Sequence, residues 1–442
     1  MRKSCMLLYM SILFGALSAQ QEDKMQWFAD AKLGIFIHWG IYAVDGTDES
    51  WAFYNNKVPY EQYMSQLSRF SAARYQPQEW ADWIAESGAR YAVLTAKHHD
   101  GVALWNTRQL HTVAKSPLSI PQLSPAKRDV LTPFIQAIKQ KGLKAGVYYS
   151  ILDWSHPDYT GFRKDSARYS IQQDPARWKR FQAFNQAQLR ELMEEQNPDL
   201  WWFDGGWEHS AEEWNAREIR EMLLNKNNNA IINERLTDNG DYGTPEQNFP
   251  IVRPKEKHWE LCMTTNDNWG FQYKDKNWKT PKEIITIFAD VVANGGNLLL
   301  DIGPMEDGTI PPEQVNILKE LGRWNKKHEE AIFNTVPGLS SGHFYGPSTL
   351  SKDSMSLYLF LPGNATGAIE VKGILNSVKS AEIVGASKIC STKVVGKISW
   401  SAKPGLLFID IPSDPRFTDP MMTVVKLSFS EPIKIYSGTG GL

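Results

Sequence analysis

Short apolar runs alternate with amphipathic stretches from about Lys32 to Trp324, and this alternation constrains the fold more than any other feature of the chain. The runs are rich in β-branched and aromatic residues, which is typical of buried strands in a parallel sheet. The predicted strands are Leu33–Ile37, Tyr91–Thr95, Ala145–Ser150, Leu200–Phe203, Ala230–Asn233, His258–Met263 and Asn297–Ile302. No glycine signature of the dinucleotide-binding type follows any of them, so an α/β fold with a (β/α)8-like TIM barrel is favoured over an open doubly wound sheet.

Helices are predicted between most of these strands. Stretches with apolar residues on one helical face are Pro77–Glu86, Val130–Lys141, Pro175–Glu195 and Pro281–Ala293. Three of the four begin with a proline, which suits the first turn of a helix, and Gly142 follows the Val130 stretch as a stop signal.

The pattern changes after Pro337, where short strands are separated by Gly, Pro, Ser and Asn and no helix is evident. The predicted strands here are Met355–Leu361, Ala368–Val371, Ala381–Val384, Leu406–Ile411, Val424–Phe429 and Ile433–Tyr436. Such a series is typical of an antiparallel β-sandwich. We therefore predict a barrel catalytic domain over residues 20–337 and a C-terminal β-sandwich domain over residues 338–442.

Residues 1–19 have the pattern of a secretory signal peptide. Arg2 and Lys3 precede an apolar stretch from Met6 to Leu17, and small residues end the segment at Ala19. The apolar stretch is shorter than the roughly 20 residues needed to span a bilayer, and no second candidate follows. The sequence thus predicts an exported protein, periplasmic or extracellular, without a membrane span.

Charge and cysteine content exclude other classes of protein. The formal net charge is −2, which gives no reason to expect nucleic acid as a partner. Removal of the signal peptide leaves two cysteines, Cys262 and Cys390, too few for a disulfide framework and too far apart for a local zinc motif. The sequence is compatible with a monomer or a homo-oligomer.

Polar side chains follow several predicted strands, at the edge where barrel enzymes place their active sites. They are His38, His98, His99, Asp204 and Arg235. Three imidazoles with a carboxylate suggest a metal site as one alternative, but neither a His-x-His nor a His-Glu-x-x-His spacing occurs. We favour their use as neutral hydrogen-bonding groups for sugar hydroxyls, with tryptophans as walls, and predict no metal.

Asp204 ends the aromatic run Trp201–Phe203 and precedes two glycines, which allow a ligand to approach closely. It is the candidate nucleophile. Glycoside hydrolysis with retention needs a second carboxyl group that protonates the leaving oxygen. Glu246 lies in a Gly- and Pro-rich loop that can close over the site, whereas Glu260 lies in a predicted strand, and both remain candidates.

Six motifs together resemble the α-L-fucosidases of glycoside hydrolase family twenty-nine over about residues 27–337. They are Gly34–Gly40, Lys97–Gly101, Trp202–Gly205, Asn233–Arg235, Trp259–Glu260 and Gly295–Pro304. The resemblance implies a retaining exo-hydrolase that removes terminal α-linked L-fucose from fucosylated oligosaccharides or glycoconjugates through a covalent fucosyl-enzyme. It also implies a barrel followed by a β-sandwich, with no metal or organic cofactor.

The resemblance implies a role for each matching residue. Asp204 corresponds to the nucleophile, and Glu246 resembles the usual acid/base position, with Glu260 as the alternative. The implied fucose-binding residues are His38, Trp51, His98, His99, Trp202 and Arg235.

One departure from the family pattern is Ser50-Trp51, where family members commonly have Glu-Trp. A hydroxyl in place of a carboxylate loses charge-assisted hydrogen bonds of roughly 1.5 to 3 kcal/mol. Two alternatives to a fucosidase follow: a hydrolase with relaxed specificity towards a related sugar such as a galactoside, or a catalytically impaired carbohydrate-binding protein. Glu49, one position earlier, is the candidate to supply the missing carboxylate through a shifted backbone.

Overall fold

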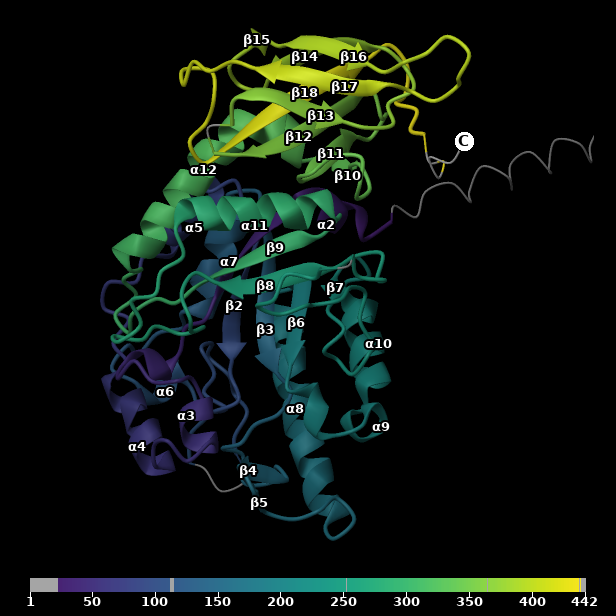
Figure 1. The fold of residues 1–442 in the computed structure, drawn as a ribbon. Helices are drawn as coiled ribbons and strands as arrows, with labels where there is room; N and C mark the ends of the chain where they lie inside the picture. Colours follow the sequence, from purple (N-terminus) through teal and green to yellow (C-terminus); the bar gives the residue numbers. More distant parts are fainter. Residues whose placement is uncertain (1–22, 112–114, 252, 364, 437, 439–442) are drawn as a thin grey trace, which may run out of the picture.

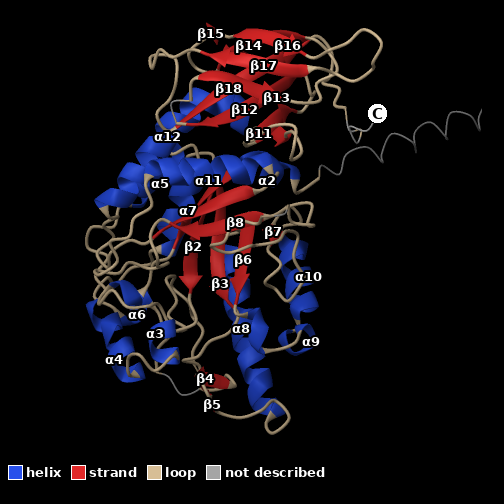
Figure 2. Cartoon of the chain, viewed as in Figure 1, coloured by secondary structure: helices blue, strands red, loops and turns tan. Residues whose placement is uncertain are grey.

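The computed structural model of the protein describes residues 23–111, 115–251, 253–363, 365–436 and 438. The predicted signal peptide, residues 1–19, lies outside the described residues. A parallel sheet covered by helices forms the larger part of the molecule, and antiparallel sheets lie at one end of it (Figures 1 and 2).

The larger part is a curled parallel sheet of seven strands in the order β7-β6-β3-β2-β1-β9-β8. The strands are β1 (Leu33–Ile37), β2 (Tyr91–Lys97), β3 (Lys144–Ser150), β6 (Leu200–Asp204), β7 (Ile231–Ile232), β8 (Glu260–Thr264) and β9 (Asn297–Ile302). Each predicted barrel strand is present, although β7 is shorter than expected. This arrangement confirms the prediction of a TIM-like barrel.

An irregular segment, Tyr242–Glu246, lies between the two edge strands β7 and β8. Tyr242 bridges to Asn233 at the end of β7, and Glu246 bridges to Cys262 in β8, both in parallel. Backbone hydrogen bonds join the segment to β8, including Cys262 N–H to the Pro245 carbonyl at 3.1 Å. The sequence predicted only a loop here, because the strand-like pairing of this segment depends on neighbours distant in the chain.

Side chains along each strand point alternately into the barrel and outwards to the layer that faces the helices. Phe36, Tyr148, Trp202 and Cys262 belong to one buried cluster inside the barrel, whereas Trp201 packs in the larger cluster outside it. Successive side chains of a strand point to opposite faces. Asp204 therefore points to the same side as Trp202, towards the interior.

Helices cover the outside of the sheet, and those predicted are present at or within one residue of the expected bounds. They include α5 (Pro77–Glu86), α7 (Leu131–Gln140), α8 (Pro175–Glu195) and α11 (Pro281–Ala293). The remaining helices are α2 (Gln26–Ala31), α3 (Trp51–Tyr54), α4 (Tyr60–Ser65), α6 (Ile120–Leu123), α9 (Ala211–Trp214), α10 (Ala216–Lys226) and α12 (Pro312–Ile332), with short 3-10 turns η1 (Ile41–Ala43), η2 (Gln66–Arg69) and η3 (Gly206–Glu208). A small hairpin, β4 (Gly161–Arg163) and β5 (Ser166–Ala167), precedes α8. No helix within the described ranges is long and apolar enough to cross a membrane.

The antiparallel part contains a six-stranded sheet in the order β10-β11-β12-β18-β14-β15 and a three-stranded sheet in the order β13-β17-β16. Its strands are β10 (Thr335–Pro337), β11 (Ser348–Ser351), β12 (Ser356–Pro362), β13 (Gly367–Val371), β14 (Val378–Ile383), β15 (Lys388–Ile389), β16 (Ser391–Val395), β17 (Leu406–Ile411) and β18 (Met422–Phe429). The predicted strand Ile433–Tyr436 is wrong: its one ladder contact is an isolated bridge from Ile435 to Ile374.

The antiparallel sheets pack on α11 and α12, and the Trp324 indole N–H donates to the Met422 carbonyl at 2.8 Å. The arrowheads of β2 and β3 in Figure 1 point away from these sheets. The carboxyl edge of the barrel, where active sites form, is therefore the edge remote from the sandwich.

Candidate active site

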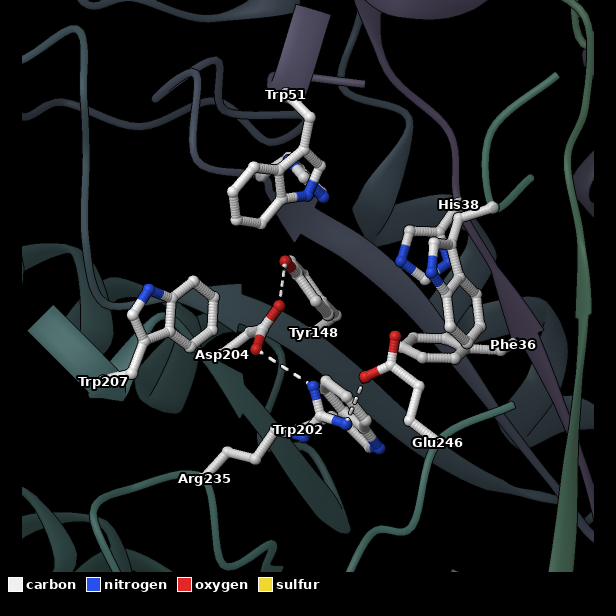
Figure 3. Close-up of a pocket in the computed structure, with 11 residues that line it drawn as sticks. Phe36, His38, Trp51, Tyr148, Trp202, Asp204, Trp207, Arg235 and Glu246 are labelled. Carbon is white, nitrogen blue, oxygen red and sulfur yellow. Dashed lines mark hydrogen bonds and ion pairs between the residues drawn. The ribbon is translucent and has the colours of Figure 1, made fainter. Parts of the chain in front are cut away.

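A cavity of about 320 Å³ opens at the carboxyl edge of the barrel (Figure 3). Its lining residues all fall between positions 36 and 269, so among the described residues the antiparallel sheets contribute none. They are Phe36, His38, Trp51, His98, Tyr148, Trp202, Asp204, Trp207, Arg235, Glu246 and Trp269. Seven of the nine predicted site residues line this cavity, and His99 and Glu260 do not.

Asp204 is held by two donors at the end of β6. The Tyr148 hydroxyl donates to Oδ2 at 2.9 Å, and Arg235 Nη1 donates to Oδ1 at 3.2 Å. Burial, and secondly the Asp204 charge, raise the pKa of Tyr148 well above its usual value, so its hydroxyl stays a donor. The carboxylate is thereby fixed in orientation while it faces the cavity.

Arg235 links the two cavity carboxylates. Its Nη1 contacts Asp204, and its Nη2 donates to Glu246 Oε2 at 2.7 Å. The guanidinium also lies over the face of the Trp202 indole, 4.6 Å from the ring centroid. Burial opposes the charge, but the neighbouring carboxylates raise the pKa of Arg235, so it remains a cation. Figure 3 shows the guanidinium between Asp204 and Glu246.

Glu246 and Glu260 occupy different environments. Glu246 lines the cavity with 41% of its side chain exposed. Glu260 is fully buried, accepts hydrogen bonds from the Tyr91 hydroxyl and from Trp202 Nε1 at 3.0 Å, and lies behind the indole that forms the cavity wall. Burial raises the pKa of Glu260 to about 7. Its position suits holding Trp202 rather than contacting a ligand.

The three predicted histidines are each held through Nδ1. His38 pairs with Asp301 Oδ1 at 2.7 Å, His98 with the Ser50 hydroxyl at 2.5 Å, and His99 with the Ser150 hydroxyl at 2.7 Å. Burial lowers the pKa of each imidazole well below its usual value, so the rings are neutral near pH 7. His99 lies behind Asp204, with its Nε2 3.6 Å from Oδ2.

Ser50 and Glu49 do not place a carboxylate in the cavity. Ser50 is fully buried and uses its hydroxyl on His98. The Glu49 carboxylate accepts the Gly270 backbone N–H at 2.5 Å, next to the cavity residue Trp269, and burial raises its pKa to about 7. The departure from the family pattern therefore leaves this loop with a support for an imidazole instead of a charged group facing a ligand.

Four lining residues were not predicted from the sequence: Phe36, Tyr148, Trp207 and Trp269. Phe36 lies on a predicted strand two residues before His38, and Tyr148 lies on a predicted strand two residues before Ser150, so the alternation of side chains along each strand was a usable signal. Trp269 comes from an irregular loop and lies 4.9 Å from the His38 ring, centroid to centroid. No local pattern indicates that contact.

No group of three or more His, Cys, Asp or Glu side chains in the described part of the chain is arranged to hold a metal ion. Two carboxylates contact one guanidinium in a cavity walled by aromatic rings and neutral imidazoles. A pair of carboxyl groups in such a cavity is typical of the glycoside hydrolase class.

Comparison with known proteins identifies the family. A model of the Alpha-L-fucosidase family matches residues 15–330, and the chain belongs to that family. A tissue alpha-L-fucosidase of Macaca fascicularis is 29% identical over 88% of this chain and 85% of its own length.

The chain is also similar to solved structures of alpha-L-fucosidases. Alpha-L-fucosidase isoenzyme 1 from Paenibacillus thiaminolyticus superposes with a TM-score of 0.80 and 29% identity, covering 93% of this chain and 99% of its own. An alpha-L-fucosidase of Bacteroides thetaiotaomicron, trapped as a covalent intermediate with 2-fluoro-fucosyl fluoride, has a TM-score of 0.78 and 26% identity, covering 92% and 96%.

The Ser50 contact predicts a loss of stability when it is removed. Ser50→Ala leaves the buried His98 Nδ1 without its partner, which should lower the free energy of unfolding by about 1 to 3 kcal/mol. Ser119→Ala is the matched control, since Ser119 is equally buried but its hydroxyl has no hydrogen-bond partner within the described structure. Urea unfolding of both variants measures the difference; equal losses would contradict the assigned contact.

Proposed function

We propose that this protein hydrolyses terminal α-L-fucosidic linkages with retention, using Asp204 as nucleophile and Glu246 as acid/base. The observation that carries this proposal is that both carboxylates contact the guanidinium of Arg235 at the wall of one cavity. A cavity of about 320 Å³ inside the barrel rim suits one sugar residue, which favours cleavage at chain ends. Family membership and the trapped intermediate of a structural relative support the same chemistry.

In the first step, Asp204 attacks the anomeric carbon of fucose. The bond from that carbon to the glycosidic oxygen breaks, and Glu246 transfers its proton to this oxygen, which leaves with the aglycone. The product is a fucosyl ester of Asp204. Tyr148 and Arg235 orient the carboxylate for attack, since each donates to one of its oxygens.

In the second step, Glu246 removes a proton from water, which attacks the anomeric carbon and releases Asp204. The contact with Arg235 suits the ionised form of Glu246 that this step requires. Proton donation in the first step needs the protonated form, so the incoming substrate must loosen that contact. The exposure of Glu246 leaves it room to move.

The remaining cavity groups bind the sugar. His38 and His98 are neutral and lie at the cavity wall, so their free ring nitrogens are suited to the hydroxyls of fucose. Trp51 and Trp202 offer aromatic faces for its apolar surface. His99 acts from behind Asp204, and Glu260 acts by holding Trp202.

Export of the protein is also part of the proposal, based on residues 1–19. Cleavage after Ala19 would give a mature chain that begins at Gln20. Amino-terminal sequencing of the protein from the culture medium or periplasm of its native cells should yield this start. Recovery of the uncleaved chain from the cytoplasm would contradict export.

Replacement of the nucleophile should remove the activity. Asp204→Ala should lower kcat for an aryl α-L-fucoside by about 10⁴-fold or more, because no other carboxylate among the described residues contacts both Tyr148 and Arg235. A fluorinated fucosyl fluoride should add one fucosyl group to the Asp204 peptide of the wild type, detected by mass spectrometry. An adduct on another residue would refute the assignment.

Replacement of the acid/base should give a different signature. Glu246→Ala should lose most activity on a natural fucoside, whereas azide should restore turnover of an aryl fucoside and give fucosyl azide, because azide attacks without a general base. Glu260→Gln is the comparison: it should lose less activity and gain nothing from azide. Azide rescue of Glu260→Gln instead of Glu246→Ala would transfer the role to Glu260.

A further inference from the structure

Exposed apolar side chains gather on one hairpin of the antiparallel sheets, formed by β16 and β17. Of the thirteen large apolar side chains that are exposed among the described residues, six fall between positions 389 and 406. They are Ile389, Val394, Val395, Ile398, Trp400 and Leu406. Single exposed apolar residues are common on protein surfaces, whereas a cluster of them points to an interaction site.

The strand β16 is uncovered on both faces. It forms the open edge of the sheet β13-β17-β16, and all of its residues are exposed. Val394 lies opposite Leu407, which is buried in the sandwich core, yet Val394 is itself 54% exposed. Val395 lies on the other face, opposite Leu406, and is 41% exposed. Strands of a folded sheet ordinarily bury at least one face, so these apolar residues are left for another surface to cover.

The tip of the hairpin carries the most exposed tryptophan of the described residues. Trp400 is 84% exposed, and Ile398 in the same turn region is 42% exposed. Tryptophan has an apolar body with one polar N–H, and it is enriched where hydrocarbon meets water at membrane surfaces. The tip therefore combines an indole with an aliphatic side chain.

The hairpin and the segment that leads into it are basic. Residues 383–409 contain neither Asp nor Glu, and they contain four lysines, Lys388, Lys393, Lys397 and Lys403. The first carboxylate after the tip is Asp410, four residues beyond Leu406 and thus about 13 Å along the strand. Glu370, on the neighbouring strand β13, is paired with Lys372 at 3.3 Å. Positive charge therefore flanks the exposed apolar tip.

Among three kinds of partner, the side chains of the hairpin favour one. A second copy of this chain would place lysines against lysines, and Lys393 on an open edge opposes strand pairing between copies. An anionic polysaccharide suits the lysines, but it buries little of an aliphatic side chain such as Ile398 or Val395. An anionic lipid surface suits both, because lysines attract the headgroups while aliphatic and indole groups enter the headgroup boundary.

We propose that the β16–β17 hairpin binds the surface of a lipid bilayer that contains anionic phospholipids, with Trp400 and Ile398 inserted at the headgroup level. The hairpin belongs to the antiparallel part, at the end of the molecule opposite the carboxyl edge of the barrel (Figure 1). The reaction cavity of the bound protein would thus face away from the membrane. This inference does not depend on the proposed reaction, because no hairpin residue lines that cavity.

Cosedimentation with lipid vesicles tests the proposal. The chain that begins at Gln20 is used, so that the apolar stretch within residues 1–19 does not itself bind lipid, and it keeps every described residue. We expect it to bind vesicles of phosphatidylglycerol and phosphatidylcholine at least about tenfold more tightly than vesicles of phosphatidylcholine alone. Raising the salt concentration from about 0.1 M to about 1 M should weaken binding, because salt screens the attraction.

Variants separate the charged from the apolar contribution. Replacing two lysines together, by Lys393→Gln and Lys397→Gln, should weaken binding to the anionic vesicles about tenfold or more. Trp400→Ala should weaken it at least about fivefold, because the indole no longer inserts. Tyr345→Ala is the matched control and should bind like the wild type. Tyr345 is 82% exposed with Lys372 Nζ 5.0 Å from its ring centroid, but it lies outside the basic stretch.

All of these variants should keep the wild-type kcat/KM for an aryl α-L-fucoside, which shows that they are folded. Unchanged vesicle binding by Trp400→Ala, or an equal loss for Tyr345→Ala, would overturn the proposal. Wild-type binding to dextran sulfate without binding to anionic vesicles would also overturn it, as would a dimer in analytical ultracentrifugation that Trp400→Ala dissociates. Failure of the wild type to hydrolyse the fucoside would instead refute the proposed function.

Discussion

The guanidinium of Arg235 is the interaction on which the candidate site depends. It contacts Asp204 on β6 and Glu246 on the irregular segment beside β8, and it rests on the Trp202 indole. One planar cation with several donors can hold two carboxylates in a fixed relation, which an ammonium group on a flexible stem does less well. The mutual position of the proposed nucleophile and acid/base is therefore set by a side chain that neither attacks nor transfers a proton.

Behind the cavity, a layer of buried polar contacts fixes the groups that face a ligand. Glu260 holds Trp202, while Ser50 and Asp301 hold His98 and His38. Burying polar groups is unfavourable unless they are paired, so each such contact also limits the rotation of the residue in front of it. Side chains held in this way lose less entropy when a ligand binds, so the proposed sugar site is preorganised.

Irregular segments supply cavity residues that the barrel strands do not. Tyr242–Glu246 fills the gap between β7 and β8 through isolated bridges, and it carries the proposed acid/base at the cavity edge. Further along the chain, the Gly270 backbone N–H donates to the Glu49 carboxylate. This contact fixes the loop that bears Trp269. The antiparallel sheets pack on α11 and α12 at the opposite end of the barrel, and within the described residues they line no part of the cavity.

The sequence by itself determined the barrel and the residues at its strand ends. Strands buried on both faces read as continuous apolar runs, so β1 and β9 were located to the residue, and His38 and Asp204 were found because they follow such runs. Only the tertiary structure decided that Glu260 is buried behind Trp202, that Glu246 sits on a paired segment, and which loops close the cavity. Those contacts join residues far apart in the chain, and pairing with distant partners leaves no periodic pattern in the segments themselves.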